Sequence, residues 1–286
     1  RVQHGLASSI SFEDLGLSLR PLVKRGYVAL ESNRMVLDDA IVEAASSVPQ
    51  RSRMLVHLAN RLSNADEPSR YSMYSIVGGV VPKQIGKAPF GPFPADGNGD
   101  AMASLPEDGV VINKWLADDL GLKRGGRLTV AYHRVGSHGE LPEEERTFRV
   151  HAVTPMAGPA TDRGLTPHVP GITDVRTFRD WRQPFKMNLD ALTQRDDDYW
   201  DDYRATPKAF IRYSTAVGLW KSRYGTSTSL RLAVDPSDPK VMERVKKGVE
   251  SKIDLSQLGL TVQAVKQHGV DAASGTTPFS GLFLGF

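Results

Sequence analysis

An acidic segment contains the residues whose types could most directly do chemistry. It carries five carboxylates in seven residues: Asp196-Asp197-Asp198-Tyr199-Trp200-Asp201-Asp202. Such a run could bind calcium, a hard cation that takes several oxygen ligands. No glycine follows at the turn position, however, and the spacing does not match an EF-hand calcium loop. The pattern favours a solvated acidic turn, with Tyr199 and Trp200 packed inward, or carboxylates paired with Arg195 and Arg204.

Histidines are the second candidate ligands for a metal ion. The chain has seven: His4, His57, His133, His138, His151, His168 and His268. Three of them, His133, His138 and His151, lie near one predicted hairpin and could approach one another. Strand alternation places His151 on the face opposite Phe148, which favours a surface position. We therefore predict no metal ligands here.

Nucleotide-binding and hydrolase motifs are missing from the sequence. The run Gly97 to Met102 lacks the third glycine of a dinucleotide-binding loop, and Gly86-Lys87 lacks the distant glycine and the Ser or Thr of a phosphate loop. There is no Gly-x-Ser-x-Gly elbow and no His-Glu-x-x-His zinc pair. Cysteine is absent, which excludes thiol catalysis, disulfides and cysteine-ligated metals. The sequence thus predicts no catalytic residues, no cofactor-binding residues and no cofactor.

The charge of the chain does not indicate a nucleic-acid partner. Lys and Arg number 36 against 33 Asp and Glu, a net charge of +3. The cations Lys83, Lys87, Lys246 and Lys247 are scattered, and no aromatic residues alternate with them to stack on bases. We expect no nucleic acid among the partners.

The loop Phe90-Gly91-Pro92-Phe93-Pro94 is apolar. It is either an exposed tip that docks a partner or a segment packed on the edge of a sheet, and its composition leaves both open.

Alternating and helical patterns predict the elements that must position these residues. Alternation predicts strands at 27–32, 54–62, 71–81, 109–112, 127–132, 146–153, 230–234 and 260–264. The strands at 54–62 and 71–81 make a predicted antiparallel pair, and those at 127–132 and 146–153 a hairpin. Helices are predicted to begin at Asp38 or Asp39, at Asn113, and at Asp238-Pro239. Residues 155–205 are irregular, with Trp181 and Trp200 as anchors, which is typical of a functional segment or an insertion.

Length and order together predict the organisation of the chain. The 286 residues correspond to about two domains. Strand–helix–strand at 27–62 is mirrored at 230–264, so we expect an α+β fold of two related halves with a β-rich unit inserted between them. The chain ends in an apolar stretch, Pro278 to Phe286. That stretch either docks on the core or is the beginning of a membrane helix too short to span.

Several stretches resemble the FtsX-like permeases of ABC transporters, which include relatives of the MacB exporter. The first runs from Val110 to Gly126 and has the form of a short helix followed by a Gly-rich turn. Later stretches resemble a branch of the family with a large loop: 157–160, 165–167, 170–172, 198–200, 206–210, 219–220 and 222–225. The resemblance spans about residues 26–286, and the order of the stretches carries it.

The resemblance implies a particular fold. In that family the extracytoplasmic domain lies between the first and second membrane helices. We therefore expect a porter-like split α/β subdomain at 1–105 and 229–275. A β-rich subdomain with a long irregular region, as in the MacB periplasmic core domain, is expected at 106–228. Residues 276–286 are expected to start the second transmembrane helix.

The resemblance also implies a function, that of a non-catalytic domain on the extracytoplasmic (periplasmic) side of the cell membrane. The domain would couple ATP-driven motion to export or extraction of a lipoprotein, peptide or amphiphile, or to a partner outside the membrane. The implied partners are its own transmembrane helices and a separate cytosolic ABC ATPase. A periplasmic partner or lipoprotein substrate and a second permease copy are further candidates.

A second class of function stays open on the sequence. The chain could be a secreted hydrolase or glycan-binding module that uses the 155–228 region. Asp197, Asp201 and His168 would then supply the acidic and basic groups, with paired carboxylates at a fixed separation.

Overall fold

The computed structural model describes residues 10–96, 99–134, 136, 138–181, 187–254, 256–259 and 265–274. The chain divides into two compact units: Ser11–Ile253, and Arg1–Ile10 together with Asp254–Phe286. The second unit contributes one described helix, α8 (Val265–Ser274). None of the helices described is both long and apolar enough to cross a membrane. The larger unit is described below.

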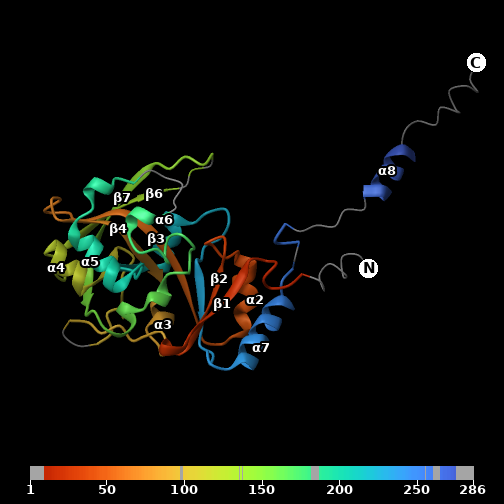
Figure 1. Ribbon diagram of the computed structural model, residues 1–286, viewed down its shortest axis with the longest axis horizontal. Helices are drawn as coiled ribbons and strands as arrows, with labels where there is room; N and C mark the ends of the chain where they lie inside the picture. Colours follow the sequence, from red (N-terminus) through yellow and green to blue (C-terminus); the bar gives the residue numbers. More distant parts are fainter. Residues whose placement is uncertain are drawn as a thin grey trace, which may run out of the picture. The chain divides into compact units, whose positions relative to one another are not determined.

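The larger unit is built on one sheet of nine described strands (Figure 1). The strands are β1 (Leu17–Leu22), β2 (Tyr27–Ser32), β3 (Arg51–Asn64), β4 (Tyr71–Val80), β5 (Gly109–Asn113), β6 (Arg127–His133), β7 (Glu143–Thr154), β8 (Ala209–Arg212) and β9 (Ser229–Leu232). The α-helices are α2 (Asp39–Ala44), α3 (Pro82–Ile85), α4 (Lys114–Leu120), α5 (Gln194–Tyr203), α6 (Tyr213–Trp220) and α7 (Pro239–Glu250). Short 3-10 turns lie at Val23–Arg25, Ala45–Ser47, Gly158–Thr161, Arg163–Leu165, Phe178–Asp180 and Leu189–Ala191.

Six of the strands close into a barrel-like ring. The sheet order is β1-β2-β9-β3-β4-β8-β5-β7-β6, and β6 pairs back onto β3. Strand β3 is long enough to serve both parts of the sheet. Its first residues, Arg51 to Met54, pair with β9, and its last, Ala59 to Asn64, pair with β6. The remaining strands β1, β2 and β9 therefore extend the barrel on one side.

Helix ends follow from local chemistry. The side chain of Asn113 accepts a hydrogen bond from the Leu116 amide at the start of α4. Gly121 ends that helix in the left-handed conformation (φ 64°), which glycine adopts without steric cost. Asp238 caps α7 in the same way, and Pro239 occupies its first position, where no amide is needed. Helix α7 contacts α2 beside β1 and β2.

Three clusters of buried side chains hold these layers together. The largest combines the barrel strands with α4 and α6, through residues such as Leu62, Ile112 and Trp220. A second lies under the loop of residues 86–106 and includes Phe90 and Phe93, which are 2% and 0% exposed. The apolar loop is thus packed on the sheet, and these two rings are not an exposed tip for a partner.

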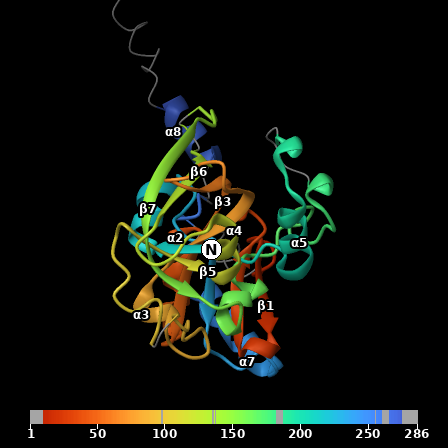
Figure 2. The ribbon, with the colours of Figure 1, turned by 90° about the vertical axis from the view of Figure 1, so that its left-hand side faces the viewer.

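The third cluster belongs to the insertion, by which we mean residues 155–207 between β7 and β8. Phe178, Trp181 and Trp200 pack with ring centroids 4.9–5.2 Å apart. These rings contact Met73 and Tyr74 of β4. Figure 2 shows α5 and the insertion's helical turns on one side of the strands, and the loop that contains α3 on the other. The prediction that Trp181 and Trp200 anchor the irregular segment is confirmed.

Most predicted elements are confirmed, with one correction. The β3–β4 pair, the β6–β7 hairpin and the caps of α2, α4 and α7 occur where the patterns placed them. The predicted acidic turn is wrong, because residues 194–203 form helix α5. Mixed helix and strand content is confirmed, while the subdomain division at 105/106 and 228/229 stays a prediction. The predicted strand 260–264 and the predicted membrane-helix start at 276–286 lie entirely outside the described residues.

Candidate functional site

An apolar cavity of about 330 Å³ opens between the barrel and the insertion. Strands β3 and β4 line it with Val56, Leu58 and Ile76, and the insertion lines it with Val169 and Ile172. Its volume is at the lower end of the range for small-molecule sites, about 300–1,000 Å³. We call this space the apolar cavity.

Two large apolar side chains at the cavity are exposed to solvent. Met35 is 47% exposed and Leu141 is 38% exposed. They belong to the small set of large hydrophobic residues exposed in the described part of the chain. Met35 also has a positive φ of 66°, which is uncommon for a residue other than glycine. Apolar surface exposed to water costs free energy. The position of Met35 and Leu141 beside an apolar cavity therefore favours a role for these side chains in binding a ligand.

His57 of β3 is the titratable side chain best placed at the cavity. Its Nε2 lies 3.0 Å from the backbone oxygen of His133. A carbonyl oxygen only accepts, so Nε2 carries the proton. The ring stacks on Trp220 with centroids 4.9 Å apart. Burial lowers the pKa of His57 to about 4, and the bond to His133 offsets that only in part. At neutral pH the imidazole is therefore uncharged and suited to apolar surroundings.

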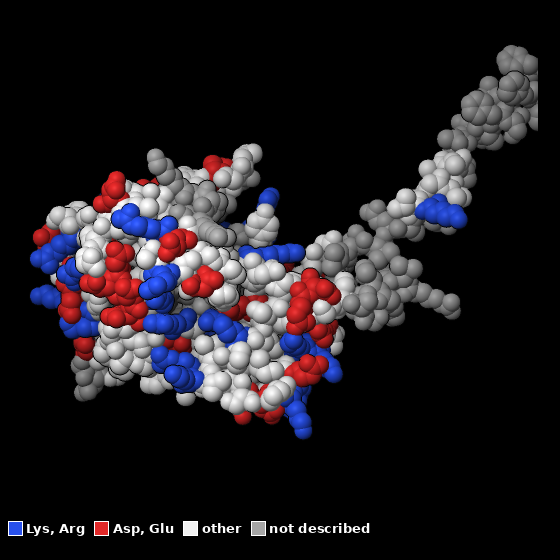
Figure 3. Space-filling model, in the orientation of Figure 1, with Lys and Arg blue, Asp and Glu red and all other residues white. Residues whose placement is uncertain are grey.

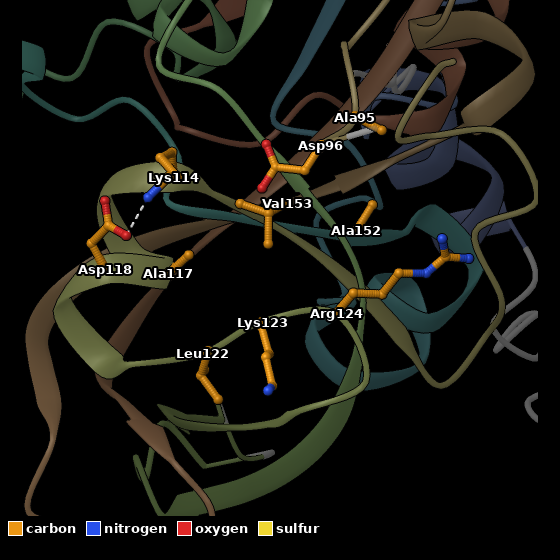
Figure 4. A pocket seen from close by; sticks show the side chains of 10 residues that line it. All are labelled: Ala95, Asp96, Lys114, Ala117, Asp118, Leu122, Lys123, Arg124, Ala152 and Val153. Atoms are coloured by element: carbon orange, nitrogen blue, oxygen red, sulfur yellow. Dashed lines mark hydrogen bonds and ion pairs between the residues drawn. The ribbon is translucent and has the colours of Figure 1, made fainter. Parts of the chain in front are cut away.

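A second hollow, of about 530 Å³, lies beside α4 (Figure 4). Lys114, Lys123 and Arg124 line it, together with Asp96 and Asp118. Lys114 is ion-paired with Asp118 on the next turn of the helix. Figure 3 shows acidic and basic side chains interspersed over the visible face of the molecule. The hollow is mixed in charge, and we assign no ligand to it.

The acidic segment is used for folding. Asp196 is 1% exposed and forms a capping box with Thr193 at the start of α5. Asp198 accepts a hydrogen bond from Gln194, and Asp201 pairs with Arg204 at 3.5 Å. Arg195 binds Asp119 of α4 instead of a carboxylate of its own segment. Within the described residues, no group of three or more His, Asp or Glu side chains is arranged to hold a metal ion.

Asp196 also belongs to a buried polar network with Ser72 and Lys208 that the sequence patterns did not predict. The Lys208 ammonium donates to the Ser72 hydroxyl at 2.7 Å, and that hydroxyl donates to Asp196 Oδ1 at 2.7 Å. Lys208 lies over the rings of Trp115 and Tyr199, 4.2 and 4.4 Å from their centroids. Burial lowers its pKa to about 8, although Asp196 and Asp119 act in the opposite direction. The network of Lys208, Ser72 and Asp196 therefore holds α5 of the insertion against the barrel.

Of the groups proposed for a hydrolase, Asp197 and Asp201 lie one turn apart on α5 and affect each other's charge, and among the described residues no hydrogen bond or ion pair joins His168 to either of them. The backbone amide of His168 donates to Glu31, and its ring lies 3.4 Å from the Thr173 hydroxyl. Asp201 accepts a bond from Arg204, the residue that follows its helix. Burial, and then the charge of Asp196, raise the pKa of Asp197. Of the hairpin histidines, His151 contacts the Ala103 backbone oxygen through its ring, and His138 donates its backbone amide to Glu140.

Comparison with known proteins gives structural neighbours and no sequence match. No protein-family model matches the chain, and no curated protein does. Solved structures similar to it include the following two. One is a domain of a protein described as a permease, from Porphyromonas gingivalis, with 9% identity, a TM-score of 0.38, and coverage of 77% of this chain and 70% of that one. The other is the periplasmic region of MacB from Actinobacillus actinomycetemcomitans, with 11% identity, a TM-score of 0.38, and coverage of 79% and 86%.

The apolar cavity is the feature that sequence reasoning missed. Its lining comes from residues as far apart as Met35 and Thr228. The alternating pattern predicts that Val56 and Leu58 share one face of a strand. The irregular composition of 155–205, which includes Pro167, predicts a functional segment or an insertion. Nothing in the spacing showed that the two would face each other.

Proposed function

We propose that the chain is a non-catalytic extracytoplasmic domain of an ABC transporter permease. The domain acts on a molecule with an apolar part, such as an amphiphile, a lipoprotein or an apolar peptide, on the outer side of the cell membrane. Its partners are its own transmembrane helices and a separate cytosolic ATPase. The secreted hydrolase or glycan-binding module is the less favoured alternative.

The observation that carries this proposal is the apolar cavity between the barrel and the insertion. Its walls belong to two layers, so a small separation of those layers would change its volume and its access to solvent. A site between two such layers suits capture and release of an apolar group better than it suits covalent chemistry, which needs convergent polar groups. The order of family-like stretches along the sequence supports the same function.

Motion would reach the cavity through the covalent connections of the domain. ATP binding on the cytosolic side moves the membrane helices, and rigid attachment converts that movement into a displacement of this domain. Capture when the cavity is open and release when it closes would then give directed transfer. In this scheme the chain itself needs no cofactor.

A cross-linking experiment on the complete transporter tests the proposal. The chain has no cysteine, so Leu141→Cys on the β6–β7 hairpin and Ile172→Cys on the insertion introduce the only thiols of this domain, one on each wall of the cavity. Bis-maleimides of increasing length should join them and hold the cavity in one state. We expect substrate transfer to stop while ATP binding persists. Single-cysteine variants treated with the same reagents control for labelling, and unchanged transfer in the linked protein would contradict the proposal.

Two further tests separate the permease from the hydrolase. The permease requires an apolar segment of about 20 residues adjoining the domain on each side in the encoded protein, and a gene without them would contradict it. Replacing Asp197 and Asp201 by asparagine should leave transfer intact. If those variants stay folded and lose all activity, the enzyme is the better description.

A further inference from the structure

Two exposed loops lie side by side at one end of the larger unit. One is formed by residues 33–37, between β2 and α2, and the other by residues 221–227, between α6 and β9. The Leu37 amide donates a hydrogen bond to the Ser227 oxygen at 2.8 Å. A Cβ added to Gly225 would lie 2.1 Å from the Leu37 oxygen, so the two backbones are in close contact. The side chains of both loops therefore form one continuous surface.

This surface combines apolar and basic side chains. Met35 and Tyr224 are large hydrophobic residues that are 47% and 61% exposed. Arg34, Lys221 and Arg223 are exposed beside them. The Arg223 guanidinium lies 4.9 Å from the centroid of the Tyr224 ring and donates to its hydroxyl. We call these five side chains the loop patch.

Two cations of the loop patch are available to an external anion. The side chains of Arg34 and Lys221 make no hydrogen bond or ion pair in the described part of the chain. The adjoining carboxylates, Asp38 and Asp39, are bonded at the start of α2, where they accept from the Ala40 amide and the Thr226 hydroxyl. Three cations against two carboxylates leave the two loops and the start of α2 net positive.

The loop patch lies at the end of the larger unit from which the rest of the chain departs. The Asn33 amide donates to the Gly16 oxygen at 2.9 Å, which places the patch beside the start of β1. The Phe12 amide donates to the Glu250 carboxylate at 2.9 Å, which brings the last turn of α7 to the same end. The larger unit spans Ser11–Ile253, so both of its connections to the rest of the chain lie at this end.

We infer that the loop patch contacts the surface of an anionic lipid bilayer. The inference rests on the proposed function, in which membrane helices lie beyond both connections, so that this end of the domain faces the bilayer. The cations bind lipid phosphates, and each contributes about fivefold in affinity near an anionic surface. Met35 and Tyr224 enter the interface, where tyrosine rings are enriched because one end is apolar and the other polar. Since Met35 also lines the apolar cavity, this contact brings one rim of the cavity to the bilayer.

The test measures whether Tyr224 approaches lipid. The chain has no cysteine, so Tyr224→Cys in the full chain of 286 residues carries a single nitrobenzoxadiazole fluorophore. The vesicles contain equal parts of phosphatidylcholine and phosphatidylglycerol, with a nitroxide-labelled phosphatidylcholine that quenches the fluorophore on contact. Val23→Cys is the matched control, because Val23 is 60% exposed and lies at the opposite end of β1 and β2. Quenching is specific to the labelled position, so lipid binding by another segment does not produce it.

A second arm measures the contribution of charge in the labelled protein. Arg34→Gln combined with Lys221→Gln removes two cations of the loop patch and breaks no side-chain bond among the described residues. Lys24→Gln combined with Lys87→Gln makes the same change in net charge away from the patch, since the loop that contains Lys87 approaches Gly26 at the other end of β2.

We expect quenching at Tyr224→Cys and not at Val23→Cys. The double variant of the loop patch should weaken binding to the anionic vesicles about tenfold, and the control double variant less than about twofold. Vesicles of phosphatidylcholine alone should quench the Tyr224→Cys label much less.

Three outcomes would overturn the inference. Equal quenching at the two labelled positions would mean that lipid is approached without a preferred surface. Equal weakening by the two double variants, or equal binding to neutral vesicles, would remove the role of the patch cations. Absence of quenching at Tyr224→Cys would leave an acidic protein as the better partner for the loop patch. Each variant is first checked for folding by circular dichroism. A failure here leaves the cross-linking test of the permease role unaffected.

Discussion

The ammonium of Lys208 lies 3.6 Å from Asp196 Oδ1, and both side chains are buried, 3% and 1% exposed. Lys208 directly precedes β8 of the barrel, and Asp196 is the third residue of α5 in the insertion. The helix of the insertion and the barrel strand that follows it in the chain are thus joined by opposite charges in a place that water does not reach.

Removing one member of this pair should be costly. Lys208→Met leaves Asp196 as an uncompensated buried charge, so we expect a loss of about 3–5 kcal/mol in the free energy of unfolding. Lys208→Met combined with Asp196→Asn should lose less than the single variant, because no charge then remains buried. Urea unfolding measures both. The exposed pair of Lys114 and Asp118 provides the control, and Lys114→Met should cost no more than about 0.5 kcal/mol. A double variant with a lower free energy of unfolding than Lys208→Met would contradict the view that an uncompensated buried charge causes the loss.

Acid should destabilise the protein through His57. Its pKa is about 4 in the folded chain against 6.5 unfolded, so the unfolded chain takes up the proton first as pH falls. The associated stability is complete above pH 6.5 and is lost as pH falls from 6.5 to 4. We expect a loss of roughly 2 kcal/mol, less than the full shift implies because the ring borders the cavity. His57→Gln should flatten this part of the stability–pH curve, whereas His151→Gln should not; identical curves for wild type and His57→Gln would contradict the assignment.

Gly79 of β4 should not tolerate a methyl group. A Cβ there would lie 2.3 Å from the Cβ of Ala216 in α6 and 3.1 Å from the Leu55 oxygen. Because both neighbours are fixed in helix and sheet, Gly79→Ala should cost about 1–3 kcal/mol in thermal or urea unfolding. Gly218→Ala, on α6 with no atom within 4 Å, is the matched control and should stabilise by up to about 1 kcal/mol. Similar effects from the two changes would mean that β4 and α6 are not this close.

Arg231 of β9 should be dispensable for stability. It is completely buried, and its Nε and Nη1 have no hydrogen-bond partner among the described residues. Burial is the main cause that lowers its pKa. The nearby carboxylates have other partners: Asp162 accepts from Tyr27, and Glu31 pairs with Arg20. Arg231→Met should therefore change the free energy of unfolding by less than about 1 kcal/mol, or raise it. A loss above 3 kcal/mol would show that the guanidinium is essential.

The strands and helix starts that depend on neighbouring residues alone could be predicted from local sequence patterns. Alternation placed β2, β6 and β7, and the caps at Asn113 and Asp238 fixed two helix starts. Strand β1 was not predicted, because Pro21 interrupts the strand pattern. A proline is tolerated there because β1 lies at the edge of the sheet, where one side of the strand needs no hydrogen bonds. Helix α5 was not predicted, because its sequence is rich in aspartate and aspartate has a low helix propensity. Its stability comes from the capping box and from burial of Tyr199 and Trp200, which are properties of the folded molecule.

Closure of the ring, and formation of the cavity between the ring and the insertion, depend on contacts between residues distant in sequence. The pairing of β3 with β6 joins residues near 60 to residues near 130. Whether the insertion covers the sheet depends on where Phe178 and Trp181 find apolar neighbours, and that is decided in three dimensions. The sequence marked the segment as unusual, but its role as a cavity wall required the assembled sheet.

The sharing of β3 limits where this domain can bend. One unbroken strand is hydrogen-bonded to β9 at its beginning and to β4 and β6 further on. Rotation between the barrel and the flanking strands would have to break that ladder, so those two parts have few independent degrees of freedom. The insertion leaves the sheet after Thr154 and returns at Ala209, and among the described residues it is attached to the barrel by side-chain packing and the Lys208–Asp196 pair and not by a strand ladder. Any gating of the cavity therefore follows from displacement of its outer wall against a stationary inner one.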